Sequence, residues 1–99
     1  MIGYRFLSPA EEEMAEASLR YETASNGLGK EFLDDLQRTV DMLREHPKLG
    51  RPAGRGLRQA PFRRFPFLLI YADEPDQLIV VAVAHQKRRP GYWRGRIES

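Results

Sequence analysis

The chain has 99 residues, of which 41% are hydrophobic and 30% are charged, with a formal net charge of +2. These values predict one globular domain over residues 1–99 and exclude a disordered chain. The lack of cysteine excludes disulfides and thiolate chemistry, and the longest apolar run is too short for a membrane span. We expect a cytoplasmic protein that does not bind a membrane, because its start does not resemble a signal peptide. We also expect no cofactor and no metal, since its two histidines show no ligand spacing.

Charge divides the chain into an acidic first part and a basic second part. Residues 1–46 hold ten Asp/Glu against five Lys/Arg, a balance of −5. Residues 47–99 hold eleven Lys/Arg against four Asp/Glu, a balance of +7. A basic half-domain is typical of proteins that bind nucleic acid or an acidic protein surface. A folded dipole without such a partner is the alternative.

The first part predicts a strand followed by two helices. Residues 2–7 form the strand, and Ser8 is the expected cap of a first helix with a narrow apolar face. An Asn-Gly pair at 26–27 ends that helix, and a second one follows over residues 28–45. Pro47 ends the second helix because it restricts the residue before it. So short a turn predicts an antiparallel helical hairpin.

The second part predicts a plain connecting loop over residues 48–56 and three strands. The strands are expected at residues 57–62, 65–72 and 77–86, and the last is apolar on both faces, as a central strand is. Residues 92–98 can form at most a short final helix. The prediction is an α+β fold of order β-α-α-β-β-β: a helical hairpin packed on a small twisted antiparallel sheet whose other face is partly open.

Basic and aromatic residues gather after the last predicted strand, in the stretch HQKRRPGYW. Antiparallel pairing of the last two strands brings Arg63 and Arg64 close to this stretch, so the cations converge on one end of the sheet. Strict alternation along the strand places His85 at the end of the open face. The expected target-binding residues are Arg58, Arg63, Arg64, Lys87, Arg88, Arg89, Tyr92 and Trp93.

Three functions fit this end of the sheet. In a metal-independent ribonuclease, His85 and Tyr92 would transfer protons, and two arginines, Arg64 and Arg88, would clamp the phosphate. Binding of a protein or nucleic acid without chemistry is the second function, and the residues alone favour it. The third is a solvated edge whose charges prevent aggregation, with the histidine bonded to backbone and Tyr92 and Trp93 serving as a hydrophobic latch.

Over nearly its whole length the chain resembles the RelE/ParE superfamily of bacterial type II toxin–antitoxin toxins, also called plasmid stabilisation proteins. The resemblance lies in the order and spacing of YRFLSPAEEEMAEA, LREHPKLGRP, GLR and RRFPFLLIYADEPDQLIVVAVAHQKRRPGYW. RelE-like members cut mRNA in the ribosome, whereas ParE-like members inhibit DNA gyrase. The stretch AVAHQKRRPGYW, the long first helix and the few lysines in the sheet region are closer to the ParE-like branch.

The resemblance implies a toxin that inhibits gyrase by binding and is neutralised by a cognate ParD-like antitoxin with a ribbon-helix-helix DNA-binding N-terminus. A ribosome-dependent mRNA endonuclease is the alternative, with His85 or Tyr92 as terminal base and Arg64 as strand arginine. A degenerate, non-toxic interaction protein is the second alternative. Exposed apolar side chains on a small domain indicate a covering partner. We expect the antitoxin to contact Met14, Tyr21, Phe32, Leu36, Phe67 and Leu69.

Overall fold

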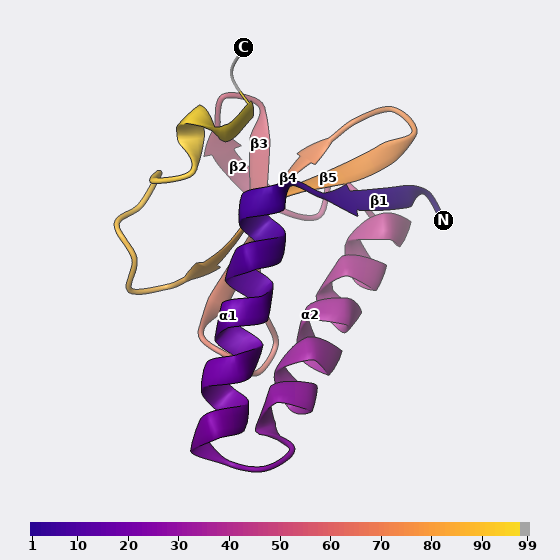
Figure 1. Ribbon diagram of the computed structural model, residues 1–99. Coiled ribbons are helices and arrows are strands. Elements are labelled where there is room, and N and C mark those ends of the chain that lie inside the picture. Colours follow the sequence, from indigo (N-terminus) through magenta and orange to yellow (C-terminus); the bar gives the residue numbers. More distant parts are fainter. Residues whose placement is uncertain (98–99) are drawn as a thin grey trace.

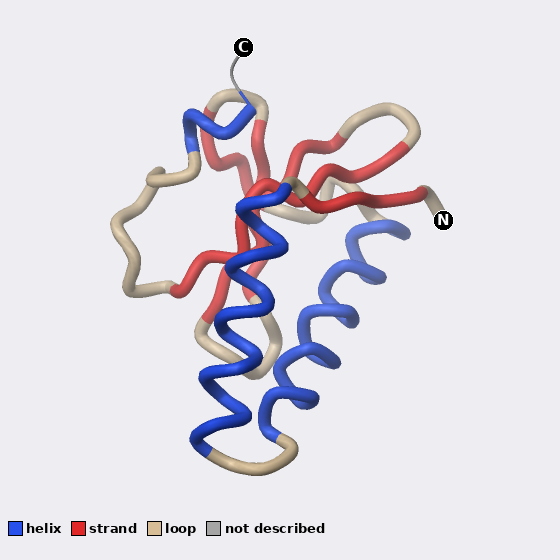
Figure 2. Tube along the Cα trace, in the orientation of Figure 1, coloured by secondary structure: helices blue, strands red, loops and turns tan. Residues whose placement is uncertain are grey.

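The computed structural model describes residues 1–97 as a helical hairpin packed across one face of a sheet (Figure 1). The elements in chain order are β1 (Gly3–Phe6), α1 (Ser8–Ala24), α2 (Leu28–Glu45), β2 (Arg51–Gly54), β3 (Leu57–Pro61), β4 (Phe67–Asp73), β5 (Gln77–His85) and a short 3-10 helix (Arg94–Ile97). Figure 2 shows the two helices side by side with most of the sheet behind them. The predicted α+β fold is confirmed.

The sheet is mixed and has five strands, in the order β1-β5-β4-β3-β2. The first strand runs parallel to β5, so the sheet is not wholly antiparallel as predicted, while all other neighbours are antiparallel. A parallel pair requires a long crossover connection, and the helical hairpin forms part of it. The expected plain loop at 48–56 is wrong, because it contains β2, which pairs with β3. Gly54 and Gly56 have φ values of 87° and 77°, which the tight turn between these strands requires.

The first helix starts without the predicted serine cap. Leu7 has extended backbone at the N-cap position, and its carbonyl accepts the N–H groups of Ala10 and Glu11. Ser8 therefore lies inside the first turn and makes no capping hydrogen bond. Pro9 beside it fits the first turn, where a backbone N–H has no partner within the helix. The second helix covers the predicted residues 28–45.

Apolar side chains pack on both faces of the sheet. The face under the helices holds the larger cluster, whose central members are Phe32, Leu36, Val40, Leu43, Leu69, Tyr71, Leu78 and Val80. The opposite face holds a smaller cluster of Leu57, Ile70, Ala72, Val81, Ala82, Ala84 and Trp93. The C-terminal tail, residues 90–97, contributes the tryptophan and so covers part of the face that was expected to be open.

A bulge in β5 decides which residues face the helices. Ile70 and Tyr71, neighbours on β4, pair with residues 82 and 80 of β5, so Val81 is an extra residue. A bulge of this kind shifts the side-chain alternation by one residue beyond it. His85 therefore lies on the helix side, where it contacts Phe67 of the larger cluster. The prediction of His85 on the open face is wrong because it assumed unbroken alternation.

Candidate functional site

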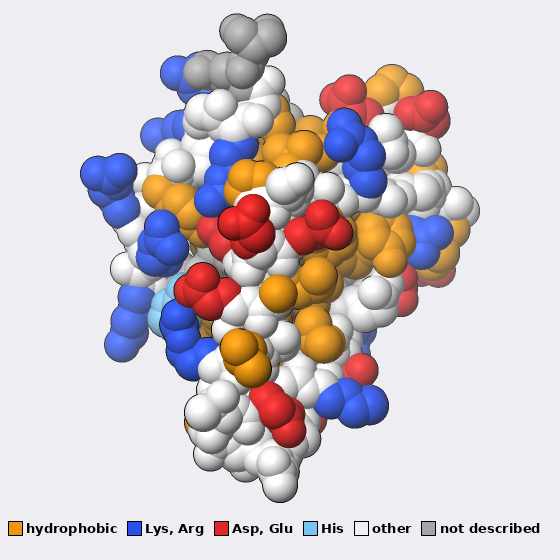
Figure 3. Space-filling view, viewed as in Figure 1, with side chains coloured by type: hydrophobic (Ala, Val, Ile, Leu, Met, Phe, Trp, Pro, Cys, Tyr) orange, Lys and Arg blue, Asp and Glu red, His pale blue; other side chains and the backbone are white. Residues whose placement is uncertain are grey.

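One end of the sheet collects five basic side chains, and we call it the cationic end: Arg63, Arg64, Lys87, Arg88 and Arg89. The loop before β4 and the turn after β5 meet there. The N–H of Gln86 donates to the carbonyl of Pro66 at 2.9 Å, and Phe67 pairs with His85. Two basic segments that are far apart in the sequence thus lie side by side. Figure 3 shows Lys and Arg side chains along the edge of the molecule where the segment after β5 runs.

A buried carboxylate fixes the loop before β4. Asp35 of α2 is 1% exposed and accepts three consecutive backbone N–H groups, those of Arg63, Arg64 and Phe65, at 2.9–3.2 Å. The guanidinium of Arg38 donates to the same carboxylate at 3.2 Å. Consecutive amides that converge on one anion make strong, directional hydrogen bonds. The cationic side chains of this loop therefore extend from a rigid backbone.

Most of the positive charge at the cationic end is uncompensated. Arg64 forms an ion pair with Glu31 of α2. Arg88 instead stacks on the ring of Tyr92, with its guanidinium carbon 4.0 Å from the ring centroid. Of the five basic residues at the cationic end, four are exposed and take part in no ion pair formed within residues 1–97, and we call them the unpaired strip: Arg63, Lys87, Arg88 and Arg89.

Arg58 does not belong to this end of the sheet, contrary to the sequence expectation. It pairs with Tyr71, close to the end of β4, whereas the cationic end lies at the start of β4. Its guanidinium donates to the carbonyls of Lys48 and Gly50 at 3.2 and 2.8 Å. The reason is that β3 and β4 are antiparallel, so the beginning of β3 lies opposite the end of β4. Arg58 fixes the loop before β2 instead.

His85 is half-buried and already engaged in a hydrogen bond. Its ring lies 5.1 Å from that of Phe67, and its Nδ1 accepts the backbone N–H of Lys87 at 3.0 Å. A neutral imidazole that accepts through Nδ1 carries its proton on Nε2. Neither ring nitrogen then offers a free lone pair to a substrate, so His85 in this arrangement stabilises the turn after β5 and is not set up as a general base.

Tyr92 is also committed to a contact within the protein. Its hydroxyl donates to the Glu13 carboxylate at 2.6 Å. Burial and this interaction with Glu13 raise the pKa of Tyr92 well above its ordinary value. A phenol that holds its proton so tightly is poorly suited to proton transfer near neutral pH. His85, Arg88 and Tyr92 line one hollow of about 210 Å³ beside α1, but Arg64 does not line it, so the four candidate nuclease residues do not share one site.

Glu13 is the centre of a latch that fastens the C-terminal tail. Its carboxylate accepts two N–H groups of the Arg96 guanidinium, at 2.8 and 2.9 Å, and the backbone N–H of Val83 at 3.0 Å. Arg96 also donates to the carbonyl of Val81, so the latch supplies a hydrogen-bond partner to the backbone of β5 just after the residues that pair with β1. Trp93 is 5% exposed within the smaller cluster. Its burial fits the predicted hydrophobic latch and removes it from the surface available to a target.

Sequence reasoning missed three residues that organise the site. Glu13 is indistinguishable from its neighbours in a run of glutamates at a helix start, and nothing in the sequence marks Arg96. Asp35 did carry a signal, because it stands three residues after Phe32 on the apolar face of α2. A carboxylate at a core position is buried only when donors surround it.

Most side chains expected to meet an antitoxin belong to the domain's own core. Met14 and Tyr21 are partly buried. The four others are buried, with exposed fractions between 0 and 6%: Phe32, Leu36, Phe67 and Leu69. The prediction of an exposed strip made of these side chains is therefore wrong, because the two helices and the helix-facing side of β4 turn them inward. The large hydrophobic side chains that the two helices do expose are Leu19, Leu33 and Met42.

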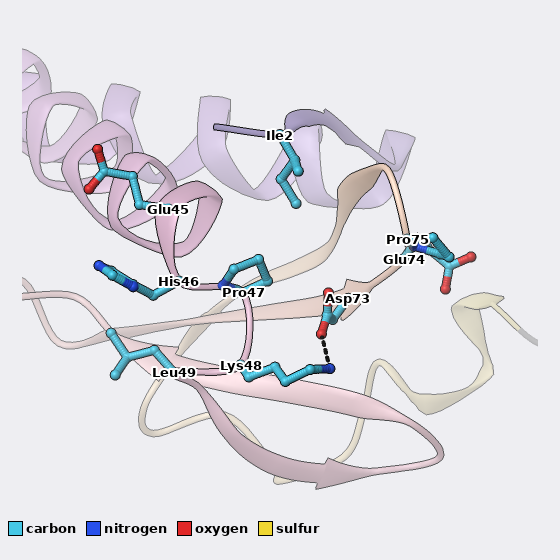
Figure 4. Close-up of a pocket in the computed structure, with 9 residues that line it drawn as sticks. All are labelled: Ile2, Glu45, His46, Pro47, Lys48, Leu49, Asp73, Glu74 and Pro75. Carbon is cyan, nitrogen blue, oxygen red and sulfur yellow. Dashed lines mark hydrogen bonds and ion pairs between the residues drawn. The ribbon is translucent and has the colours of Figure 1, made fainter.

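A larger hollow of about 700 Å³ lies at the opposite end of β4, next to the end of α2. Figure 4 shows Ile2 and Pro47 beside it, and the ion pair between Lys48 and Asp73 crosses it at 3.1 Å. None of the residues predicted from the sequence to form a site lines this hollow. Within residues 1–97, no cluster of three or more His, Asp or Glu is arranged to hold a metal, and no helix is long and apolar enough to cross a membrane.

Comparisons with known proteins agree with this arrangement. A family model described as the ParE toxin of the type II toxin–antitoxin system parDE matches residues 4–90. A solved structure described as the chromosomal ParDE TA system from P. aeruginosa contains a chain that superimposes with a TM-score of 0.69. That chain is 16% identical, and the match covers 86% of the present chain and 96% of the other, which shows a shared fold. No curated protein matches the sequence significantly.

Proposed function

The chain belongs to the ParE toxin family of type II toxin–antitoxin systems, and we propose that it blocks replication by binding DNA gyrase. The unpaired strip is the proposed contact surface, and its uncompensated charge is the observation that carries the proposal. The hydrogen bonds that occupy His85 and Tyr92 support inhibition by binding over catalysis. The toxin acts in the cytoplasm in this proposal, because gyrase and its DNA are there.

A supercoiling assay with purified gyrase and purified toxin tests the target. Lys87→Ala combined with Arg89→Ala removes two cations of the unpaired strip. Lys30→Ala combined with Lys48→Ala is the matched control, since both lysines already pair with carboxylates elsewhere on the surface. We expect wild type and control to inhibit equally, and the strip variant to require about tenfold more toxin, equivalent to about 1.4 kcal/mol of binding. Supercoiling that no toxin concentration affects would exclude gyrase as the target.

We further propose that a cognate ParD-like antitoxin covers the exposed apolar side chains of the helical hairpin. Leu19 and Leu33 are exposed at 68% and 39% and line a hollow of about 310 Å³ between α1 and α2. Figure 3 shows hydrophobic side chains gathered over the helices, with acidic ones among them. A patch of this kind on a small domain favours a covering partner. Met14 and Tyr21, which are partly exposed, extend this proposed surface towards the sheet.

Co-purification with the antitoxin encoded beside the toxin tests this surface. Leu19→Asp combined with Leu33→Asp is expected to abolish capture of the tagged antitoxin, because two carboxylates would be buried in the interface. Leu49→Asp is the control, since Leu49 is exposed but lies at the end of the molecule next to the larger hollow. Capture that stays unchanged in the Leu19→Asp, Leu33→Asp variant would contradict an antitoxin site on the hairpin.

An mRNA endonuclease is the second candidate, because His85, Arg88 and Tyr92 do line one hollow. Primer extension on mRNA after induction decides between the two functions. Codon-phased cuts that disappear in His85→Ala and Tyr92→Phe would replace gyrase binding with cleavage in the ribosome. If expression of the chain does not arrest growth at all, it is a non-toxic interaction protein.

A further inference from the structure

The unpaired strip has the properties of a site for the phosphate backbone of a nucleic acid. We infer that Arg63, Lys87, Arg88 and Arg89 bind the backbone of duplex DNA, so that the toxin grips the DNA of the gyrase–DNA complex. This inference rests on the proposed function, because it names what the cationic end contacts there. The inference also goes beyond the proposed function, because it assigns the toxin an affinity for DNA in the absence of gyrase.

The carboxylates around the unpaired strip are already neutralised by other cations. Each pairs with its own arginine, in the combinations Glu13–Arg96, Glu16–Arg20, Glu31–Arg64 and Asp35–Arg38. Residues 47–72 and 77–97 contain no Asp or Glu, so the acidic side chains within residues 47–97 are those of Asp73, Glu74 and Asp76, at the other end of β4. The strip therefore keeps its full positive charge until an external anion binds.

The strip is also held in shape before any ligand arrives. The Asp35 carboxylate fixes the backbone at Arg63, and the Gln86–Pro66 hydrogen bond joins the two segments. The N–H of Arg88 donates to the carbonyl of His85 at 2.9 Å, and its guanidinium rests on Tyr92. Cations held by a rigid backbone lose less conformational entropy when they bind a phosphate. The arrangement thus favours a repeating, rigid polyanion.

The composition of this end of the sheet favours phosphate over a protein surface. Stable protein interfaces have a desolvated centre rich in large apolar and aromatic side chains. The exposed large hydrophobic side chains among the described residues lie outside residues 50–96, so the cationic end has no such centre. Three of the four strip residues are arginines, whose planar guanidinium matches phosphate oxygens two at a time. Backbone phosphates require only such contacts.

The aromatic residues nearby favour a duplex over a single strand. Single-stranded nucleic acids bind by stacking their bases on exposed aromatic rings. Trp93 is buried, Tyr92 is bonded to Glu13 and covered by an arginine, and His85 packs edge-on against Phe67. No ring at this end is free to receive a base. A duplex keeps its bases stacked internally and presents only its backbone, which is what the strip can contact.

Fluorescence anisotropy with a short fluorescein-labelled DNA duplex tests the inference without gyrase. Four phosphate contacts predict a slope of log K against log salt of about −3.6, which corresponds to a loss of roughly 100-fold in affinity between about 50 and 200 mM salt. Lys87→Ala with Arg89→Ala removes two contacts and reduces the slope by about 1.8. The control Lys30→Ala with Lys48→Ala removes the same charge from paired positions and leaves the slope unchanged. Circular dichroism confirms that all variants are folded.

Competitor arms identify the anion that the strip prefers. Equal binding of the duplex and of poly-glutamate would overturn the assignment in favour of an acidic protein surface. Tighter binding of the matching single strand or of an RNA duplex would overturn the assignment in favour of those ligands. An equal decrease of the salt slope in both double variants would also overturn it, because the contacts would then not be specific to the unpaired strip. Duplex binding without gyrase inhibition would refute the proposed function alone. Gyrase inhibition without duplex binding would refute this inference alone.

Discussion

The Asp35 carboxylate offers the sharpest test of how the cationic end is built. The change Asp35→Ala removes the acceptor of three consecutive backbone N–H groups, from Arg63 to Phe65, and of the Arg38 guanidinium. The N–H of Phe65 is buried, while the other two bonds are only partly buried and their donors can turn to water. The expected result is a folded protein with a loosened loop before β4 and a clear loss of stability.

The size of this loss follows from the burial of the three donors. Leaving the buried Phe65 N–H unsatisfied costs about 2 kcal/mol, and the two partly hydrated donors add about 1 kcal/mol together. Alanine is the better helix former and returns about 0.5 kcal/mol within α2. The net decrease in the free energy of unfolding is about 2.5 kcal/mol, which lowers the melting temperature of a domain of this size by roughly 10–20 °C.

Urea unfolding followed by circular dichroism measures the stability, and amide hydrogen exchange reports on the loop. Asp34→Ala is the matched control, because Asp34 lies in the same helix but its carboxylate faces solvent beside Lys30. It gains the same helix propensity and loses no backbone partner, so its stability should stay close to wild type. If Asp35→Ala unfolds like Asp34→Ala and exchange at Arg63–Phe65 does not accelerate, the carboxylate does not hold the loop.

Three further predictions concern packing and pH. Burial alone would raise the pKa of Glu13, but hydrogen bonds from Arg96, Tyr92 and Val83 outweigh it and hold the pKa below its ordinary 4.5. The stability that this carboxylate contributes is therefore present above pH 4.5 and lost as the pH falls through its lowered pKa. Urea unfolding at several pH values should show this decline in the free energy of unfolding for wild type and a smaller decline for Glu13→Gln. Trp93→Ala should lower the free energy of unfolding, measured in urea, by about 3–5 kcal/mol. Trp93→Phe should lower it much less, because the buried indole N–H has no partner within residues 1–97 to lose. Equal decreases in the two variants would contradict the latch as a packing contact. Gly29→Ala would place a Cβ 2.6 Å from the Ser18 carbonyl oxygen and force the helices apart, which should lower the stability measured by thermal unfolding by about 1–3 kcal/mol. Gly3→Ala is the control, because its Cβ would meet open space, and its stability should change little.

Local sequence patterns were sufficient for the helices and for the pairing of the last two strands. The limits of α2 follow from its apolar period and from Pro47, both of which act within a few residues. The hairpin of β4 and β5 follows from two apolar runs joined by a short polar turn. Because a hairpin places the start of one strand beside the end of the next, the meeting of Arg63 and Arg64 with Lys87 could also be predicted.

Features that depend on partners distant in the sequence could not be predicted in this way. The parallel pairing of β1 with β5 and the strand β2 in a Gly-rich loop both depend on an edge that another segment supplies. The extra residue Val81 is invisible in an unbroken apolar run, yet it moves His85 from the open face to the helix face.

The sequence by itself determined the two helices, the strands β1, β3, β4 and β5 and the place where most of the positive charge collects, because these depend on short-range periodicity and on composition. Only the tertiary structure decided which of the charged groups are free. Asp35 and Glu13 acquire their roles from backbone N–H groups far along the chain, at Arg63 to Phe65 and at Val83. A carboxylate looks the same in the sequence whether it faces water or a ring of donors, and only the folded chain brings those donors to it.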